Sequence, residues 1–206
     1  MQEDLFGYTP TMPEGFRYQA EVVPQKLQEA LLGVLPGLSF RPFDFHGYEG
    51  KRRVVSFGWK YDFDTESVRK IDDIPSFLLP LRQLAADFAG LPAEKLEQAL
   101  ITEYDVGAPI GWHRDKAVFG RVVGVSLLAP CTFRLRRRRA GKWERASVAL
   151  EPGSAYLRDC QEFCAVGHDD EKERIITWLS RKNFWTSSWL DVIHPRFSAR
   201  TVCWTI

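Results

Sequence analysis

The tripeptide His113-Arg114-Asp115 places an imidazole and a carboxylate two residues apart. Because residues i and i+2 share a face in an extended chain, both side chains would point the same way at the edge of a strand. A second imidazole would complete the set of two His and one carboxylate that holds Fe(II) and leaves three neighbouring positions open. The tripeptide alone is weak evidence, since chance gives an HxD in roughly one of four chains of this composition. Arg114 and Asp115 could equally form a pair on a solvated loop.

The third ligand of such a site must come from a later part of the chain. His168 is the only histidine between the HxD and residue 194, and the sequence predicts two or three strands before it. A return of the chain to a second sheet would bring His168 back to the HxD. His168 is therefore the candidate third ligand.

Composition limits the classes to which this chain can belong. It has 206 residues, 45% of them hydrophobic and 27% charged, which indicates one globular domain with a sizeable core. The net charge of +1 gives no global attraction to nucleic acid or to an anionic membrane. No apolar run is long enough to span a bilayer, and the N-terminus does not resemble a signal peptide, so we expect a cytoplasmic protein without membrane association. The four Cys show no zinc-knuckle spacing.

The predicted elements change character along the chain. Apolar residues at helical spacing predict amphipathic helices over residues 24–35 and 74–88, and a third short helix over 93–98. Strands separated by Gly and Pro turns dominate the remainder. This order indicates an α+β protein with a barrel or double-sheet core. The predicted strands are residues 53–57, 100–104, 122–128, 132–136, 143–150, 154–157 and 175–179.

A wider stretch around the HxD resembles a known family. The segment "ITEYDVGAPIGWHRD", residues 101–115, is similar to the motif around the HxD of the AlkB-type Fe(II)/2-oxoglutarate dioxygenases. The segments "KRRVVSFGWKYDF" upstream and "VVGVSLLAPCTFRLRRR" and "LEPGSAYL" downstream extend the likeness to roughly residues 40–170. The resemblance implies a double-stranded β-helix, or jelly-roll, core with the N-terminal helices packed on one sheet. It also implies Fe(II) as cofactor, with 2-oxoglutarate and O2 as co-substrates.

The resemblance assigns roles to residues at matching positions. His113, Asp115 and His168 would hold the iron, with no catalytic side chain beyond these ligands. Tyr104 would donate a hydrogen bond to 2-oxoglutarate. Thr102 stands where the family has an Asn, and it keeps a hydroxyl but lacks the amide.

The C-terminal motif of the family departs from its pattern here. The family has a Trp two residues before its distal His and an Arg pair that clamps the co-substrate's carboxylates, whereas this chain reads "AVGHDDEKERIITWLSRK". Arg is the residue type needed, because a buried carboxylate binds best to a bidentate, permanently charged fork. Arg174 and Arg181 are the candidates, at altered spacing.

The family likeness implies oxidative demethylation of alkylated bases, in which a hydroxymethyl product releases formaldehyde. Lys116, Ala117 and Val118 follow the HxD where many nucleic-acid repair members carry acidic residues that contact the base, so another methylated nucleic acid or a protein is the alternative substrate. From the family resemblance we expect alkylated DNA or RNA as the partner, and we expect the protein to be a monomer. A second hypothesis is a nucleic-acid- or protein-binding β-helix module whose iron or co-substrate site is degenerate.

A run of cations from Arg134 to Arg145 contains seven basic residues and one acidic residue. Such a hairpin could follow phosphates, with an aromatic side chain stacking on bases. It could equally be a solvated hairpin whose charges prevent association of sheet edges. Aromatic residues near position 45 stand where the family builds its substrate lid, although most aromatic residues are core. The residues expected to bind substrate are Trp112, Phe45, Tyr48, Arg136 and Arg138.

The C-terminal end of the chain differs in composition from the remainder. Residues 160–206 contain three of the four Cys and four of the seven Trp, with little periodicity after Lys182. We assign residues 1–182 to the dioxygenase-like domain and 183–206 to an atypical tail. A partner-binding extension would explain the shift, and so would a reading-frame change after about residue 158.

Overall fold

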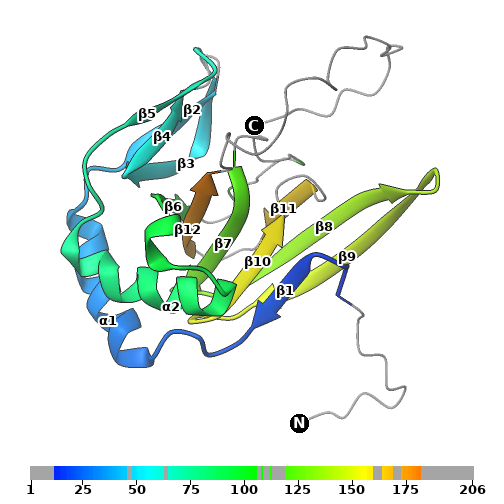
Figure 1. Cartoon of the computed structure of the whole chain (residues 1–206), viewed down its shortest axis with the longest axis horizontal. Helices are drawn as coiled ribbons and strands as arrows, with labels where there is room; N and C mark the ends of the chain where they lie inside the picture. The colour runs from blue at the N-terminus through cyan, green and yellow to red at the C-terminus, as the bar shows by residue number, and fades with distance from the viewer. Residues whose placement is uncertain are drawn as a thin grey trace.

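Antiparallel strands and two helices make up the structure, a computed structural model in which residues 12–45, 48–62, 65–105, 108, 112, 119–159, 164–168 and 173–181 are described (Figure 1). Within these residues the strands form a seven-stranded sheet with the order β1-β10-β7-β12-β6-β3-β2. Every neighbouring pair in it is antiparallel. Its strands are β1 Phe16–Gln19, β2 Arg41–Phe45, β3 Tyr48–Phe57, β6 Gln98–Tyr104, β7 Phe119–Leu127, β10 Ala155–Asp159 and β12 Glu173–Arg181.

A second, three-stranded sheet has the order β11-β8-β9. It consists of β11 Cys164–His168, β8 Cys131–Arg139 and β9 Lys142–Leu150. The chain alternates between the sheets: β7 belongs to the large one, β8 and β9 to the small one, β10 to the large one again, then β11 and β12 repeat the crossing. The strands β4 Trp59–Asp62 and β5 Ser67–Lys70 form a separate hairpin.

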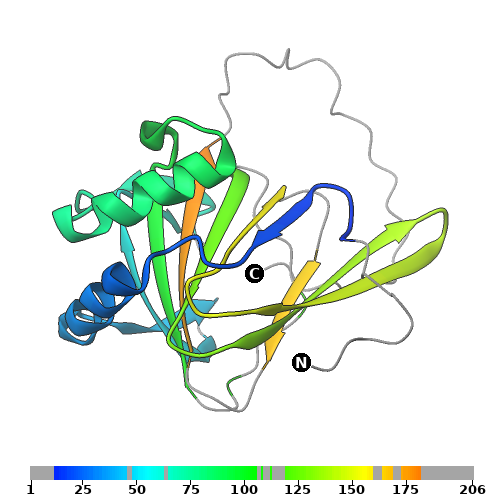
Figure 2. The ribbon, with the colours of Figure 1, turned by 90° about the horizontal axis from the view of Figure 1, so that it is seen from below.

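Helices α1 Gln25–Val34 and α2 Leu79–Ala89 lie on the same side of the large sheet (Figure 2). Both begin near a proline, which suits the first turn because its backbone needs no amide donor there. α2 ends at Gly90, whose φ of 65° is left-handed and costs glycine little. Short 3-10 segments lie at Leu35–Gly37, Ser76–Leu78 and Ala93–Lys95. No helix within the described ranges has the length and apolarity to cross a membrane.

One core lies between the helices and the large sheet. Each large aliphatic side chain buried there contributes about 1.5–3 kcal/mol relative to an exposed one. The helical side chains pack against alternate residues of the sheet, as the period of two requires. The cluster includes Leu31, Leu35, Leu81, Ala85, Ala99, Ile101, Val123, Val125, Leu127 and Ile176.

A second core lies between the two sheets. Its aromatic centre is Phe133 of β8 and Tyr156 of β10, whose ring centroids are 4.7 Å apart. The other buried members are Phe16, Cys131, Leu135, Val148 and Leu150. Two sheets that enclose a core while the chain crosses repeatedly between them form a double-stranded β-helix. The predicted fold class, with helices on one sheet, is confirmed.

The predicted helices over residues 24–35 and 74–88 are confirmed, and 93–98 shortens to one 3-10 turn. The predicted strands are present too, most of them longer at one end or both. Five strands were not predicted: β1, β2, β4, β5 and β11. Each has only four or five residues, which is too short for alternation to be distinguished from chance.

The contact between Gly124 and Tyr156 gives a test of the second core. A Cβ on Gly124 of β7 would overlap the ring of Tyr156, which is buried against neighbours on its other side. Gly124→Ala is expected to lower the free energy of unfolding by about 1–3 kcal/mol, because the ring must leave its packed position. Gly33→Ala is the control: nothing lies within 4 Å, and alanine stabilises a helix by about 0.5–1 kcal/mol relative to glycine. Urea unfolding measures both, and equal effects of the two substitutions would contradict the packing.

Candidate active site

Strand β6 carries both residues expected to contact the co-substrate. Ala99 and Ile101 belong to the helix-side core, so the alternate positions Thr102 and Tyr104 face the three-stranded sheet. Thr102 is 5% exposed, and Tyr104 is half-buried against the second core. The structure thus places these two hydroxyls on one face of one strand; their roles toward the co-substrate stay predictions.

The HxD lies in the connection from β6 to β7, which begins directly after Tyr104. His113 and Asp115 themselves lie outside the described residues. Among the residues that are described, no three His, Cys, Asp or Glu side chains gather in a possible metal site. The chemistry of the HxD suits Fe(II), because an imidazole and a carboxylate are two of the three donors in its facial sets. The roles of His113 and Asp115 stay predictions.

The structure describes the backbone of His168 and the register of its strand. His168 ends β11 and lies opposite Thr132 of β8. Thr132 alternates with Phe133, whose side chain is in the second core. The register position of His168 therefore belongs to the other face of the three-stranded sheet, away from that core. Its role as third ligand stays a prediction.

Register also places the backbone of the two candidate clamp arginines in β12. Arg174 lies between Glu103 of β6 and Leu127 of β7, and Leu127 belongs to the helix-side core. This position is on the face opposite to that of Thr102. Arg181 follows a register shift and pairs with Phe119 at the far end of β7. Neither assignment is tested by these positions.

A buried carboxylate and an arginine join β6 to β3. The side chain of Glu103 is 1% exposed, and it accepts hydrogen bonds from Nε and Nη2 of Arg53, the first at 3.1 Å. The two residues are directly opposite in register. The hydrogen bond to Glu103, followed by the negative charge of Glu103, raises the pKa of the Arg53 guanidinium above its usual value. The pair holds β6 against β3 at Glu103, the residue directly before Tyr104.

A second arginine and an aromatic ring lie on the strands next to Tyr104, in β3 and β2. Arg52 of β3 lies opposite Tyr104, and its Cζ is 3.9 Å from the ring centroid of Phe43 in β2. The predicted substrate contacts Phe45 and Tyr48 pair with each other where β2 and β3 meet, and the structure describes their backbone. β3 and then β2 thus follow β6, the strand that leads to the HxD, at this edge of the large sheet.

An aromatic–cation stack lies beside the HxD in sequence. Trp112 immediately precedes His113, and its ring centroid is 4.3 Å from Cζ of Arg136 in β8. Trp143 of β9 lies 4.8 Å from the same atom. The structure therefore brings together two residues expected to bind substrate, Trp112 and Arg136. Arg138, the last of the five residues expected to bind substrate, is exposed and lies opposite Trp143 in register.

Arg158 of β10 is a charged residue near the second core that the sequence reasoning missed. It is 3% exposed and alternates with Tyr156, opposite Phe16 of β1 and Val122 of β7. A buried guanidinium is the side chain that best binds a carboxylate. The predicted strand ended at Leu157, so Arg158 was not considered. The alternation Tyr156, Arg158 was the signal that could have found it.

Comparison with known proteins gives a family and a fold. A model of the 2OG-Fe(II) oxygenase superfamily matches residues 39–162, which is more than half of the chain. The matched range ends before His168, Arg174 and Arg181. No curated protein matches the sequence.

Three solved structures illustrate the structural likeness. OsALKBH1 superposes with a TM-score of 0.60 at 14% identity, covering 82% of this chain and 98% of its own. A prolyl-4-hydroxylase from Pseudomonas putida gives 0.57 at 15% identity, with coverages of 82% and 94%. A prolyl hydroxylase from Trichoplax adhaerens, in complex with a hypoxia inducible factor peptide fragment, gives 0.57 at 10% identity, with coverages of 81% and 84%. At these identities the likeness concerns the fold.

Substitution of Arg53 and substitution of Glu103 are expected to lower the free energy of unfolding by different amounts. Arg53→Met should lower the free energy of unfolding by about 1–3 kcal/mol, because a carboxylate that is 1% exposed loses the hydrogen bonds that Arg53 donates. Glu103→Gln should cost less, since the Arg53 side chain is 48% exposed and water can solvate it. Urea unfolding of both variants at neutral pH measures the difference. A larger loss in Glu103→Gln would contradict the description of the pair.

Proposed function

Because the chain belongs to the 2OG-Fe(II) oxygenase superfamily, we propose that it demethylates alkylated bases of DNA or RNA by oxidation. Members of this superfamily use Fe(II), with 2-oxoglutarate and O2 as co-substrates. One oxygen atom enters succinate as 2-oxoglutarate loses CO2, and the other enters the N-methyl group. The resulting hydroxymethyl group leaves as formaldehyde, and the nitrogen regains its hydrogen.

The proposed roles follow from side-chain chemistry. His113, Asp115 and His168 would hold the iron, which when bound supplies the activation of O2. The hydroxyls of Thr102 and Tyr104 share the face of β6 that leads into the HxD, and they would hydrogen-bond the co-substrate. The apolar core beneath Tyr104 would keep water from that part of the site.

The observation that carries the choice of substrate is the stack of Trp112 on Arg136. It places a planar ring and a permanent positive charge one residue before the HxD. Nucleic acid offers planar bases to such a ring and phosphate anions to such a charge, and base–aromatic stacking contributes about 1–3 kcal/mol per base. A peptide without aromatic or acidic side chains offers neither. This favours a nucleic-acid substrate over the peptides suggested by the prolyl hydroxylases of similar fold.

A specific observation favours a second candidate function, a nucleic-acid-binding β-helix module with a degenerate iron site. The family match ends at residue 162, and the register position of His168 is on the face away from the second core. Loss of the third ligand would leave a fold that binds but does not oxidise. The two functions differ in whether the protein forms a complex with Fe(II) and 2-oxoglutarate.

Substrate choice is measured by succinate release. With Fe(II) and ascorbate present, an N-methylated single-stranded oligonucleotide should stimulate succinate formation from 2-oxoglutarate at least tenfold over the unmethylated oligonucleotide. A proline-containing peptide without aromatic or acidic side chains should not stimulate it, because it offers neither a planar ring nor an anion to the Trp112–Arg136 stack. Stimulation by the peptide alone would transfer the proposal to a protein substrate.

The ligand set is measured without turnover. Anaerobic addition of Fe(II) and 2-oxoglutarate should produce the weak visible charge-transfer band of a bidentate complex. His113→Ala, Asp115→Ala and His168→Ala should each abolish it, whereas His194→Ala, a matched control, should retain it. A band that persists in His168→Ala would show that another residue is the third ligand. Absence of the band from folded wild-type protein would favour the binding module.

A further inference from the structure

The hairpin formed by β8 and β9 has two chemically different faces. Leu135, Phe133 and Val148 are buried in the second core, so the alternate positions lie on the outer face. Register pairs Arg136 with Arg145, and Arg138 with Trp143, across this face. The residues of the outer face include Arg134, Arg136, Arg138, Trp143 and Arg145.

The single acidic residue of the hairpin is on its other face. Glu144 pairs with Arg137, whose Nε lies 2.7 Å from Oε2 of Glu144. No carboxylate of residues 131–150 therefore neutralises the outer face. Like charges directly opposite each other, as at Arg136 and Arg145, destabilise a sheet. An anionic partner would offset this repulsion.

An exposed tryptophan lies among these cations. Trp143 is 40% exposed, and one part of it contacts the guanidinium of Arg136. Its exposed part can stack on a planar group, whereas the bases of a duplex are already stacked and paired. Cations beside an aromatic platform are the arrangement by which proteins bind single strands without reading sequence.

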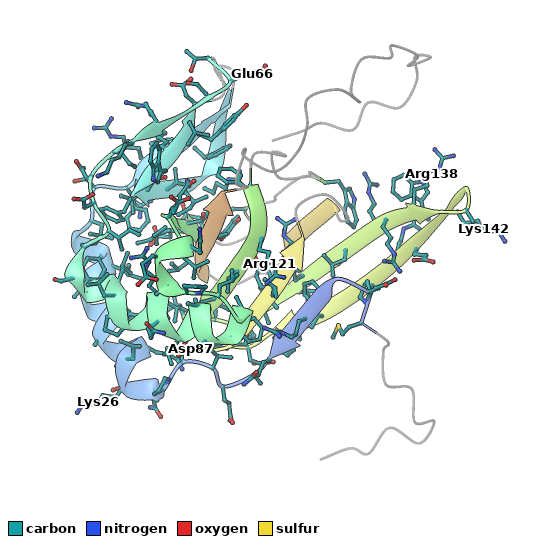
Figure 3. The ribbon with its side chains drawn as sticks, in the orientation of Figure 1. Lys26, Glu66, Asp87, Arg121, Arg138 and Lys142 are labelled. Atoms are coloured by element: carbon teal, nitrogen blue, oxygen red, sulfur yellow. The ribbon has the colours of Figure 1, made fainter. Side chains whose placement is uncertain are left out.

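The surface has a direction. The β8–β9 hairpin projects from the sheets on the side away from α1 and α2 (Figure 1), and Arg138 and Lys142 lie at its far end (Figure 3). Arg136 of β8 lies further from the end of the hairpin than Arg138 does, and it contacts Trp112. The cations thus extend from the end of the hairpin to the residue that precedes the HxD.

We propose that the outer face of the β8–β9 hairpin binds single-stranded nucleic acid and leads the strand toward the HxD. Arg134, Arg138 and Arg145 bind phosphates, and Trp143 stacks on an unpaired base. The inference rests on the proposed function for the identity of the substrate. It adds that the nucleic acid is single-stranded and that it binds the outer face of the β8–β9 hairpin. A hairpin charged only to keep its edge from pairing with other sheets is the competing explanation, and it requires neither the exposed Trp143 nor the separation of Glu144 from the outer face.

The test measures binding without iron or turnover. Fluorescence anisotropy follows the full-length protein binding to a labelled oligothymidylate, which carries no methylated base nitrogen, and to a duplex of equal length. Replacing Arg134, Arg138 and Arg145 together by Ser should weaken single-strand binding at least tenfold. It should also reduce the magnitude of the slope of log K against log salt by about 2, because each of the three lost phosphate contacts contributes roughly 0.7 to that slope. The matched control replaces the exposed cations Lys26, Lys60 and Arg69 by Ser and should bind as the wild type does.

The role of Trp143 is separated from that of the charges by two further variants. Trp143→Ala should weaken single-strand binding at least fivefold, and Trp143→Phe should retain most of it, because the stacking face remains. Unchanged affinity and salt slope in the triple hairpin variant, or equal loss in the control, would overturn the surface. Equal affinity for duplex and single strand would overturn the strand state. Because no turnover is measured, failure of demethylation leaves this result standing, and failure here leaves demethylation to be decided separately.

Discussion

The central strands β6, β7 and β10 of the large sheet are buried on both faces along most of their length, and the remainder of the structure depends on this constraint. One face packs under α1 and α2, and the other encloses the second core with β8, β9 and β11. A strand in this central position has almost no solvent-facing side, so a polar residue buried on it needs a partner or a function. Three consecutive residues of β6 illustrate the two cases, a polar residue with a partner and a polar residue with a proposed function: Thr102, Glu103 and Tyr104. Glu103 is held by Arg53, and the two hydroxyls lie on the face that leads to the HxD.

The same constraint separates the parts of the molecule by chemistry. Apolar side chains fill both faces of the central strands of the large sheet, whereas the outer side of the β8–β9 hairpin is outside both cores and carries charge. Arg136 connects that charged surface to the HxD connection through Trp112. In this account the core positions the co-substrate residues, and the hairpin supplies contacts to a large anionic partner. In the β8–β9 hairpin, stability and recognition therefore depend on opposite faces.

Much of this arrangement is readable from local pattern. The helices follow from apolar spacing of three and four, and Thr102 and Tyr104 share a face because they are two residues apart. The two faces of the hairpin were harder to predict, because arginine occupies both: Arg137 pairs with Glu144, while Arg136 and Arg138 are on the outer side. The position of His168 depends on how β11 registers with β8, and no local pattern encodes the pairing of strands far apart in sequence. Arg158 was missed because a strand end is the least defined part of a periodic pattern.

The central claim is that oxidation of 2-oxoglutarate by this protein is coupled to removal of a methyl group from a base. The most direct test follows both halves of the reaction in one sample, with mass spectrometry of an N-methylated oligonucleotide and quantification of succinate. The account predicts that the oligonucleotide loses the mass of one CH2 group for each succinate formed. It also predicts that neither change occurs in Asp115→Ala. An oligonucleotide that keeps its methyl group while succinate accumulates, or that loses it without 2-oxoglutarate, would contradict the account.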